Sequence, residues 1–119
     1  MAGVLPAEVA AVLDDYAHDR RPSRESEKAA VKATLSALVA VAPGRSVEVR
    51  IPPYAAVQVI EGTTHRRGTP SAVVETDART WLLMACGALI WADGVASGAV
   101  RASGARSDLS AWLPVFVAR

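Results

Sequence analysis

The spacing of apolar side chains changes once along the chain, at Pro43-Gly44, and this change limits the fold more than any other feature. Before it, apolar side chains recur every three or four residues, which is typical of one face of a helix. After it, over residues 46–76, apolar and polar side chains alternate, which is typical of half-buried strands. Because 119 residues suit one domain and leave no room for two, the sequence predicts a single α+β unit.

Two helices are predicted before Pro43. The first starts near Pro6, since proline is tolerated in a first helical turn, and its apolar face consists of Leu5, Val9, Val12, Leu13 and Tyr16. Arg20-Arg21-Pro22 ends this helix, and Ser23 is placed to cap the second one. The break predicts a loosely attached N-terminal helical extension over residues 1–22 and a main domain over residues 23–119.

Strands are predicted at residues 47–51, 56–60 and 71–75, with a polar loop over residues 62–70 before the third. A fourth short strand is predicted at residues 99–102. No parallel crossover is expected between the first three strands because they lie so close in sequence. The sheet should therefore be mainly antiparallel.

Short helices and turns are predicted around these last strands. Thr76-Asp77 is placed to cap a helix, and a second short helix should span about residues 89–96. Ser107-Asp108 should cap a last helical turn, which Pro114 stops. The apolar tail at residues 115–117 is expected to pack back onto the domain.

Charge and composition exclude several classes of function. With 13 basic and 12 acidic residues, the net charge of +1 offers no concentrated basic face for nucleic acid. One cysteine and two histidines allow no intramolecular disulfide and no closed zinc site, so no metal or other cofactor is predicted. The most apolar run, residues 81–92, is shorter than the ~20 residues of a membrane span, so no integral membrane segment is predicted. A lone cysteine and an N-terminus without a signal-peptide pattern predict a cytoplasmic protein.

Three glycines in the C-terminal third carry a resemblance to a known family. Gly87, Gly98 and Gly104 leave ten and then five residues between them, where a short helix and a short strand are expected. This order and spacing resembles the C-terminal half of the sterol carrier protein-2 (SCP2) family. Further segments look like its small bacterial sterol-carrier-like subgroup: residues 43–53, 56–58, 65–70, 74–77, 91–93 and 102–109. The resemblance covers the chain from about Ser23 to the C-terminus.

The resemblance implies an SCP2-like α+β fold, in which helices cover one face of a mainly antiparallel sheet and an apolar tunnel lies between the layers. The family's sheet has five strands and four can be placed here, so four to five are expected. The resemblance also implies a non-catalytic carrier of a lipid or another apolar small molecule. The alternative is an accessory or protein-interaction domain with a filled core, because the same fold occurs attached to bacterial enzymes. Homo-oligomer formation stays open.

Large apolar side chains of the C-terminal third are the candidate ligand-binding residues. They are Trp81, Leu82, Met84, Leu89, Trp91, Leu109, Trp112 and Phe116. A carrier should enclose a cavity of about 300–1,000 Å³, the usual size of a ligand site. The alternative interpretation is that these side chains form an ordinary core.

Three polar or reactive features have both a functional and a simpler interpretation. Cys86 offers a nucleophile, but it lies in an apolar block where a thiol has a raised pKa and packs as core. Glu75 and Asp77 form a carboxylate pair, and helix capping by Thr76 and Asp77 is the simpler explanation. His65-Arg66-Arg67 would suit an anionic group, or is a solvated loop tip.

Asp93 lies on an otherwise apolar short helix. A buried carboxylate needs a partner, so we expect a structural ion pair with Arg101 or Arg106. Neither histidine is paired with an acid by pattern, and no catalytic residue is assigned.

Overall fold

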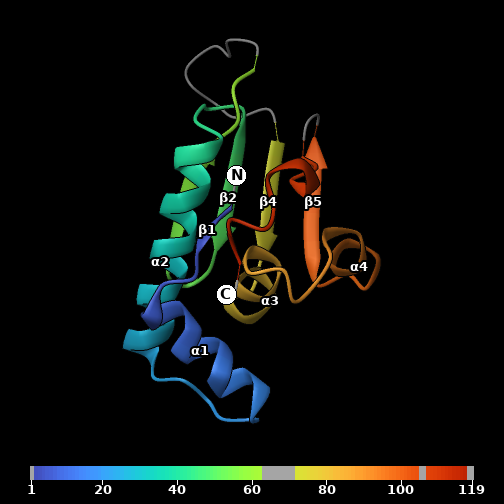
Figure 1. Cartoon of the computed structure of the whole chain (residues 1–119). Helices are drawn as coiled ribbons and strands as arrows, with labels where there is room; N and C mark the ends of the chain where they lie inside the picture. The colour runs from blue at the N-terminus through green and yellow to red at the C-terminus, as the bar shows by residue number, and fades with distance from the viewer. Residues whose placement is uncertain (1, 63–71, 105–106, 118–119) are drawn as a thin grey trace.

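The computed structural model of the chain describes residues 2–62, 72–104 and 107–117. Its main sheet has four strands in the order β3-β2-β4-β5, and helices lie against one of its faces (Figure 1). A second, two-stranded ladder joins β1 to β6, so segments from the two ends of the chain lie side by side. The α+β class predicted from the sequence is confirmed.

Two helices precede the main sheet: α1 spans Ala7–Ala17 and α2 spans Arg24–Val41. Ser23 caps α2 as predicted, because its side chain accepts a hydrogen bond from the backbone N–H of Ser26 at 3.1 Å. The first helix packs against α2 and α3 and buries Val9 and Val12 completely. It therefore contributes side chains to the common core, and the division of the chain after residue 22 stays a prediction.

At the centre of the sheet, β2 (Val47–Ile51) lies between β3 (Ala55–Val59) and β4 (Ala72–Thr76). It pairs antiparallel with β3 and parallel with β4, while β4 pairs antiparallel with β5 (Val100–Gly104). The expectation that no parallel pair would form is wrong. Because β3 runs antiparallel to β2, it ends at the end of the sheet where β2 starts, and β4 starts at that same end on the other side of β2. Two of the three pairings are antiparallel, so the sheet is mixed, with antiparallel pairs in the majority.

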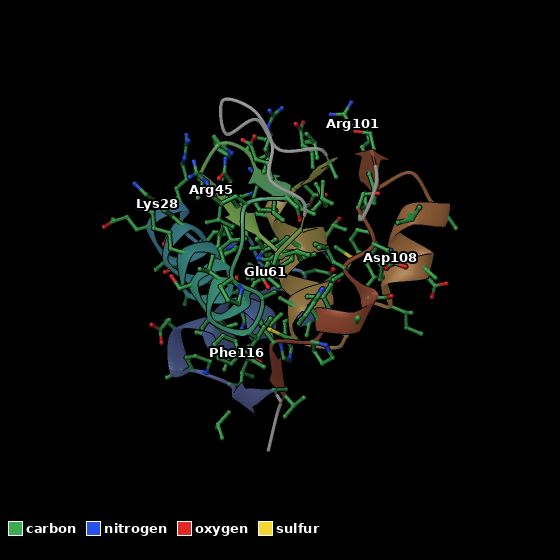
Figure 2. All side chains as sticks on the ribbon, turned by 90° about the horizontal axis from the view of Figure 1, so that it is seen from above. Lys28, Arg45, Glu61, Arg101, Asp108 and Phe116 are labelled. Atoms are coloured by element: carbon green, nitrogen blue, oxygen red, sulfur yellow. The ribbon has the colours of Figure 1, made fainter. Side chains whose placement is uncertain are left out.

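Alternation along the strands gives the sheet one buried and one solvated face. The side chains of β2 that face the helices are fully buried: Val47, Val49 and Ile51. On the opposite face, Arg50 Nε lies 3.1 Å from Glu48 Oε2, and Arg101 Nη2 lies 2.8 Å from Glu75 Oε2. Figure 2 shows Arg101 projecting from β5 away from the helices.

The core lies between the sheet and the helices. On α3 (Ala78–Ala85), the indole N–H of Trp81 donates to Thr34 Oγ1 of α2 at 2.7 Å. Both residues are fully buried, so this bond joins the two helices inside the core. The large side chains with the least exposure are Trp81, Leu35, Leu38, Ile51, Leu82, Met84 and Leu109.

Of the two residues predicted to cap α3, one does so. Asp77 is the N-cap and accepts a hydrogen bond from the backbone N–H of Thr80 at 3.1 Å. The expected capping role of Thr76 is wrong, because Thr76 is a buried residue of β4 whose hydroxyl donates to the carbonyl oxygen of Ala99 at 2.8 Å. The next helix, α4 (Trp91–Ala96), starts later than expected because the backbone of Ile90 is extended.

The C-terminal segment packs back onto the domain as predicted. A short 3₁₀ turn, η2 (Ser110–Trp112), follows Asp108, whose Oδ1 accepts from the backbone N–H of Ser110 at 2.8 Å. Then β6 (Phe116–Val117) pairs parallel with β1 (Gly3–Val4), a pairing that the sequence did not predict. No helix in the described part of the chain is both long and apolar enough to span a membrane.

Candidate functional site

A small apolar pocket lies where α3 ends, α4 begins and the chain returns toward its C-terminus; we name it the α3–α4 pocket. Its volume is about 180 Å³. The residues that line it are Met84, Gly87, Leu89, Ile90, Trp91, Ser110, Leu113 and Pro114. None of these carries a charge, so the described part of the lining suits an apolar group.

The turn after α3 shapes one side of this pocket. Gly87 has a φ of 81°, a left-handed backbone that a side chain would strain, and it lets the chain reverse directly after the helix. A Cβ added at Gly87 would meet Pro114 Cγ at 3.6 Å, so the turn packs against the returning chain. Ile90, in the connection to α4, is 68% exposed. The pocket is therefore open to solvent beside Ile90, and the buried residues of its lining are Met84 and Trp91.

The predicted ligand-binding residues lie in four different places. Met84, Leu89 and Trp91 line the α3–α4 pocket. Buried in the core are Trp81, Leu82 and Leu109. Trp112 lines a different hollow of about 410 Å³, and Phe116 is half-buried beside Gly3. The ligand-binding role of all eight stays a prediction.

Sequence reasoning missed Ile90, Leu113 and Pro114 as lining residues. Leu113 and Pro114 were read as the end of a helical turn, and only the tertiary packing brings them to α3. A large aliphatic residue next to the helix start at Trp91 was the signal that could have identified Ile90.

A comparison with protein-family models matches residues 23–115 to the family described as bacterial SCP ortholog. The chain belongs to this bacterial sterol-carrier-like family. The match begins at the cap of α2 and includes the main sheet, α3, α4 and the α3–α4 pocket, while β1 and α1 lie outside it. The resemblance drawn from the glycine spacing is thus confirmed, and the α+β architecture is consistent with an SCP2-like fold. A search of the curated proteins finds no match.

Two other hollows of the described structure have charged linings. One, of about 420 Å³, lies at the carboxyl ends of β2 and β4 and is lined by Pro52, Glu75, Thr76, Asp77, Gly98, Ala99 and Arg101. The other, of about 250 Å³, is lined by Arg24, Glu25, Lys28, Pro53 and Tyr54. Burying an apolar ligand against these charged groups would remove water from them, which costs free energy. Compared with these two hollows, the α3–α4 pocket is the better site for an apolar ligand.

Cys86 is half-buried at the end of α3, and burial raises its pKa to about 11. The thiol is therefore protonated near neutral pH, and only the thiolate is a strong nucleophile. The structure describes Cys86 as packed against the apolar core, in agreement with the simpler interpretation of its sequence context.

The buried position expected for Asp93, which was the reason for predicting an ion pair, is wrong. Its side chain is exposed on α4, and Arg101 pairs with Glu75. Arg106 and His65-Arg66-Arg67 lie outside the described residues, and so do the predictions made for them. Within residues 2–62, 72–104 and 107–117, no group of three His, Cys, Asp or Glu side chains is placed to hold a metal ion.

A polar cluster around Glu27 was not predicted from the sequence. The hydroxyls of Tyr16 on α1 and Tyr54 in the β2–β3 turn both donate to the Glu27 carboxylate, the second at 2.8 Å. Burial and the hydrogen bond to Glu27 raise the pKa of Tyr16, so its hydroxyl keeps its proton. The guanidinium of Arg79 lies 5.2 Å from the centre of the Tyr16 ring. These contacts fasten α1 to α2 and α3 and are structural.

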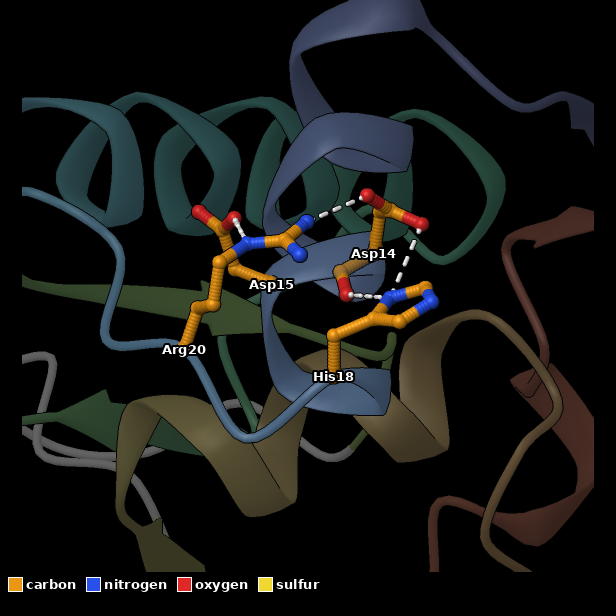
Figure 3. Close-up of polar contacts among 4 residues, drawn as sticks. All are labelled: Asp14, Asp15, His18 and Arg20. Atoms are coloured by element: carbon orange, nitrogen blue, oxygen red, sulfur yellow. Dashed lines mark hydrogen bonds and ion pairs between the residues drawn. The ribbon is translucent and has the colours of Figure 1, made fainter.

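Charged groups at the end of α1 form a second cluster, drawn in Figure 3. Arg20 Nη2 lies 2.6 Å from Asp14 Oδ2, and Arg20 Nε lies 3.0 Å from Asp15 Oδ1. His18 Nδ1 lies 2.9 Å from the carbonyl oxygen of Asp14. Most of these side chains are exposed, and their contacts lie at the C-terminal end of α1.

Proposed function

We propose that this protein is a non-catalytic binding or carrier protein for a lipid or another apolar small molecule. The observation that carries the proposal is the α3–α4 pocket, in which three of the predicted ligand-binding residues meet in an uncharged lining. Membership of a sterol-carrier-like family supports the same ligand class. A charged head group would stay at the mouth, beside the exposed Ile90, while its alkyl chain enters.

The volume of the pocket limits how many methylene groups it can bury, and therefore the free energy of binding. A methylene group is about the size of a water molecule, which takes roughly 30 Å³ in the liquid. The pocket, at about 180 Å³, therefore holds on the order of six carbons. Burying each methylene contributes about 0.8 kcal/mol, or roughly 5 kcal/mol in total, before the cost of immobilising the ligand is subtracted. This pocket alone supports only weak binding.

Native mass spectrometry of the freshly purified protein, followed by denaturing extraction, tests the proposal. We expect a bound lipid or acyl species, or a mass shift after fatty acid is added. Leu89→Trp, which fills the pocket, should abolish the shift, whereas Val95→Trp, on the exposed part of α4, should leave it unchanged. A clean apo mass that no fatty acid or sterol shifts would contradict the carrier function.

The packing between the sheet and the helices favours the accessory or protein-interaction alternative. The largest side chains there, including Trp81 and Leu82, are less than 2% exposed, so this part of the core is filled. Exposed Val4, Ile90 and Val95 would then contact a protein. In that case the apo mass would be clean, and Ile90→Asp would impair binding to a protein partner while leaving thermal stability unchanged.

A further inference from the structure

Residues 113–117, which we name the C-terminal arm, form one wall of the α3–α4 pocket. Leu113 and Pro114 contribute side chains to the lining, and Val115 is buried next to them. The opposite walls belong to helices: Met84 of α3 is 1% exposed and Trp91 of α4 is 9% exposed. The pocket therefore joins two well-packed helical walls with one wall of extended chain.

The arm is held by a short set of backbone hydrogen bonds. Val115 N–H donates to Ala85 O at 2.8 Å, Gly3 N–H donates to Val115 O at 2.9 Å, and Leu5 N–H donates to Val117 O at 3.2 Å. The β1–β6 ladder is two residues long, and Val4 and Val117 in it are both exposed. A two-residue ladder with exposed side chains opens locally more easily than a packed helix. Of the three walls, the arm is the one that can move at the least cost.

The pocket is smaller than a lipid site needs. Its volume is about 180 Å³, whereas sites for drug-sized and larger apolar ligands occupy about 300–1,000 Å³. An alkyl chain longer than about six carbons can be buried along its whole length only if one wall moves. The family match covers residues 23–115. Both strands of the ladder that fastens the arm, β1 and β6, therefore lie outside the matched segment.

We infer that the C-terminal arm is a strap over the α3–α4 pocket, fastened by β1, and that long alkyl chains enter when β6 separates from β1. This inference rests on the proposed carrier function. It makes the β1–β6 ladder a determinant of chain length: short chains fit beneath the closed strap, and long chains require it to open.

A disulfide staple across the ladder tests the strap. Val4 and Val117 are partners in the parallel register, and neighbouring strands lie about 4.8 Å apart, within the range that a disulfide bridges. The variant is Val4→Cys with Val117→Cys in a Cys86→Ser background, and Val117→Cys alone in that background is the control. Binding of dodecanoic acid and hexanoic acid is followed by the NMR shift of the Trp91 indole N–H.

The oxidised staple should weaken dodecanoic acid binding at least tenfold, reduction should restore it, and hexanoic acid binding should not change. Equal dodecanoic acid affinity in both redox states would overturn the strap and leave the carrier function standing. If neither acid binds in either state, the carrier function fails and the inference fails with it.

Amide hydrogen exchange tests the movement of the strap without any ligand. In the reduced, ligand-free protein, the N–H of Val115 and Val117 should exchange at least tenfold faster than those of α3, and the staple should slow them. Exchange as slow as that of α3 would overturn the strap whatever the acids do.

Discussion

Buried polar groups show how a single residue decides the packing of two helices. Thr34 lies inside the core, and its hydroxyl is 2.9 Å from the carbonyl oxygens of Ala30 and Val31, one of which accepts its hydrogen. Its lone pairs remain free to accept the indole N–H of Trp81. An indole N–H that loses its acceptor inside a core costs free energy, because no water replaces the bond. Thr34 thus fixes where Trp81, and with it α3, meets α2.

Thr34→Val should lower the free energy of unfolding by roughly 1–3 kcal/mol, because it keeps the shape of the side chain and leaves the Trp81 N–H without an acceptor. Urea denaturation followed by tryptophan fluorescence measures this change. Ser36→Ala, at an exposed position of the same helix, is the matched control and should have little effect. Equal stability of the two variants would show that the Trp81–Thr34 bond contributes nothing net.

The thiol of Cys86 should be slow to react at neutral pH. Its pKa is raised by burial to about 11, so the thiolate fraction is small at pH 7 and grows about tenfold per pH unit until the pKa is approached. Alkylation by iodoacetamide, measured by mass spectrometry between pH 7 and 10, should follow this slope. Fast alkylation that does not depend on pH would contradict the raised pKa.

For single residues, the sequence indicated which side chains are apolar enough to line a pocket better than it indicated where in the fold each side chain lies. The apolar character of Met84, Leu89 and Trp91 was sufficient to select them as candidate lining residues. Leu113 and Pro114 were not selected, because their place in the pocket depends on how the chain returns to α3. Glu27 was not selected either, since its partners Tyr16 and Tyr54 come from distant parts of the chain.

The glycines that follow helices differ in how much space the surrounding atoms leave for a side chain. At Gly44, which follows α2, φ is 151° and an added Cβ would lie 2.1 Å from the carbonyl carbon of Ile60. Since both groups belong to the backbone, neither can rotate away. At Gly87, φ is 81° but the nearest atom to an added Cβ is 3.6 Å away.

Gly44→Ala should therefore lower the free energy of unfolding by more than about 3 kcal/mol, because the helix end must separate from β3. Gly87→Ala should cost only about 1–2 kcal/mol, the strain of a left-handed backbone. Chemical denaturation of the two variants gives the comparison. The reverse order, with Gly87→Ala the more damaging, would contradict the packing described at the end of α2.

The carboxylate of Glu27 adds to the attachment of α1, which also buries Val9 and Val12. Glu27→Gln keeps one acceptor oxygen where two tyrosine hydroxyls now donate, so one hydroxyl loses its acceptor, at a cost of about 1–2 kcal/mol. Amide hydrogen exchange should accelerate in α1 while the strands of the main sheet stay protected. Glu25→Gln, an exposed neighbour on α2, is the control. Unchanged exchange in α1 would show that Val9 and Val12 hold the helix without this cluster.

Elements whose ends are decided by local chemistry were predicted closely. Ser23 and Asp77 cap their helices because each side chain reaches a backbone N–H three residues later, which adjacent residues determine. The parallel pairing of β2 with β4 was not predicted, because it depends on where the chain goes after β3. The β1–β6 ladder escaped prediction as well, since two residues on each strand carry no readable alternation.

For the molecule as a whole, carrier function implies a link between ligand concentration and stability. A ligand that binds the folded state alone stabilises it by about 2.7 kcal/mol at a hundred times its Kd. For a chain of 119 residues this corresponds to a rise in Tm of about 10 °C. Dodecanoic acid should produce this rise in a thermal scan of the wild-type chain, and Leu89→Trp should remove it. A chain whose only function is protein interaction would show no rise with either variant, because its filled core offers the acid no place in the folded state. A rise that persists in Leu89→Trp would locate the site in another part of the fold.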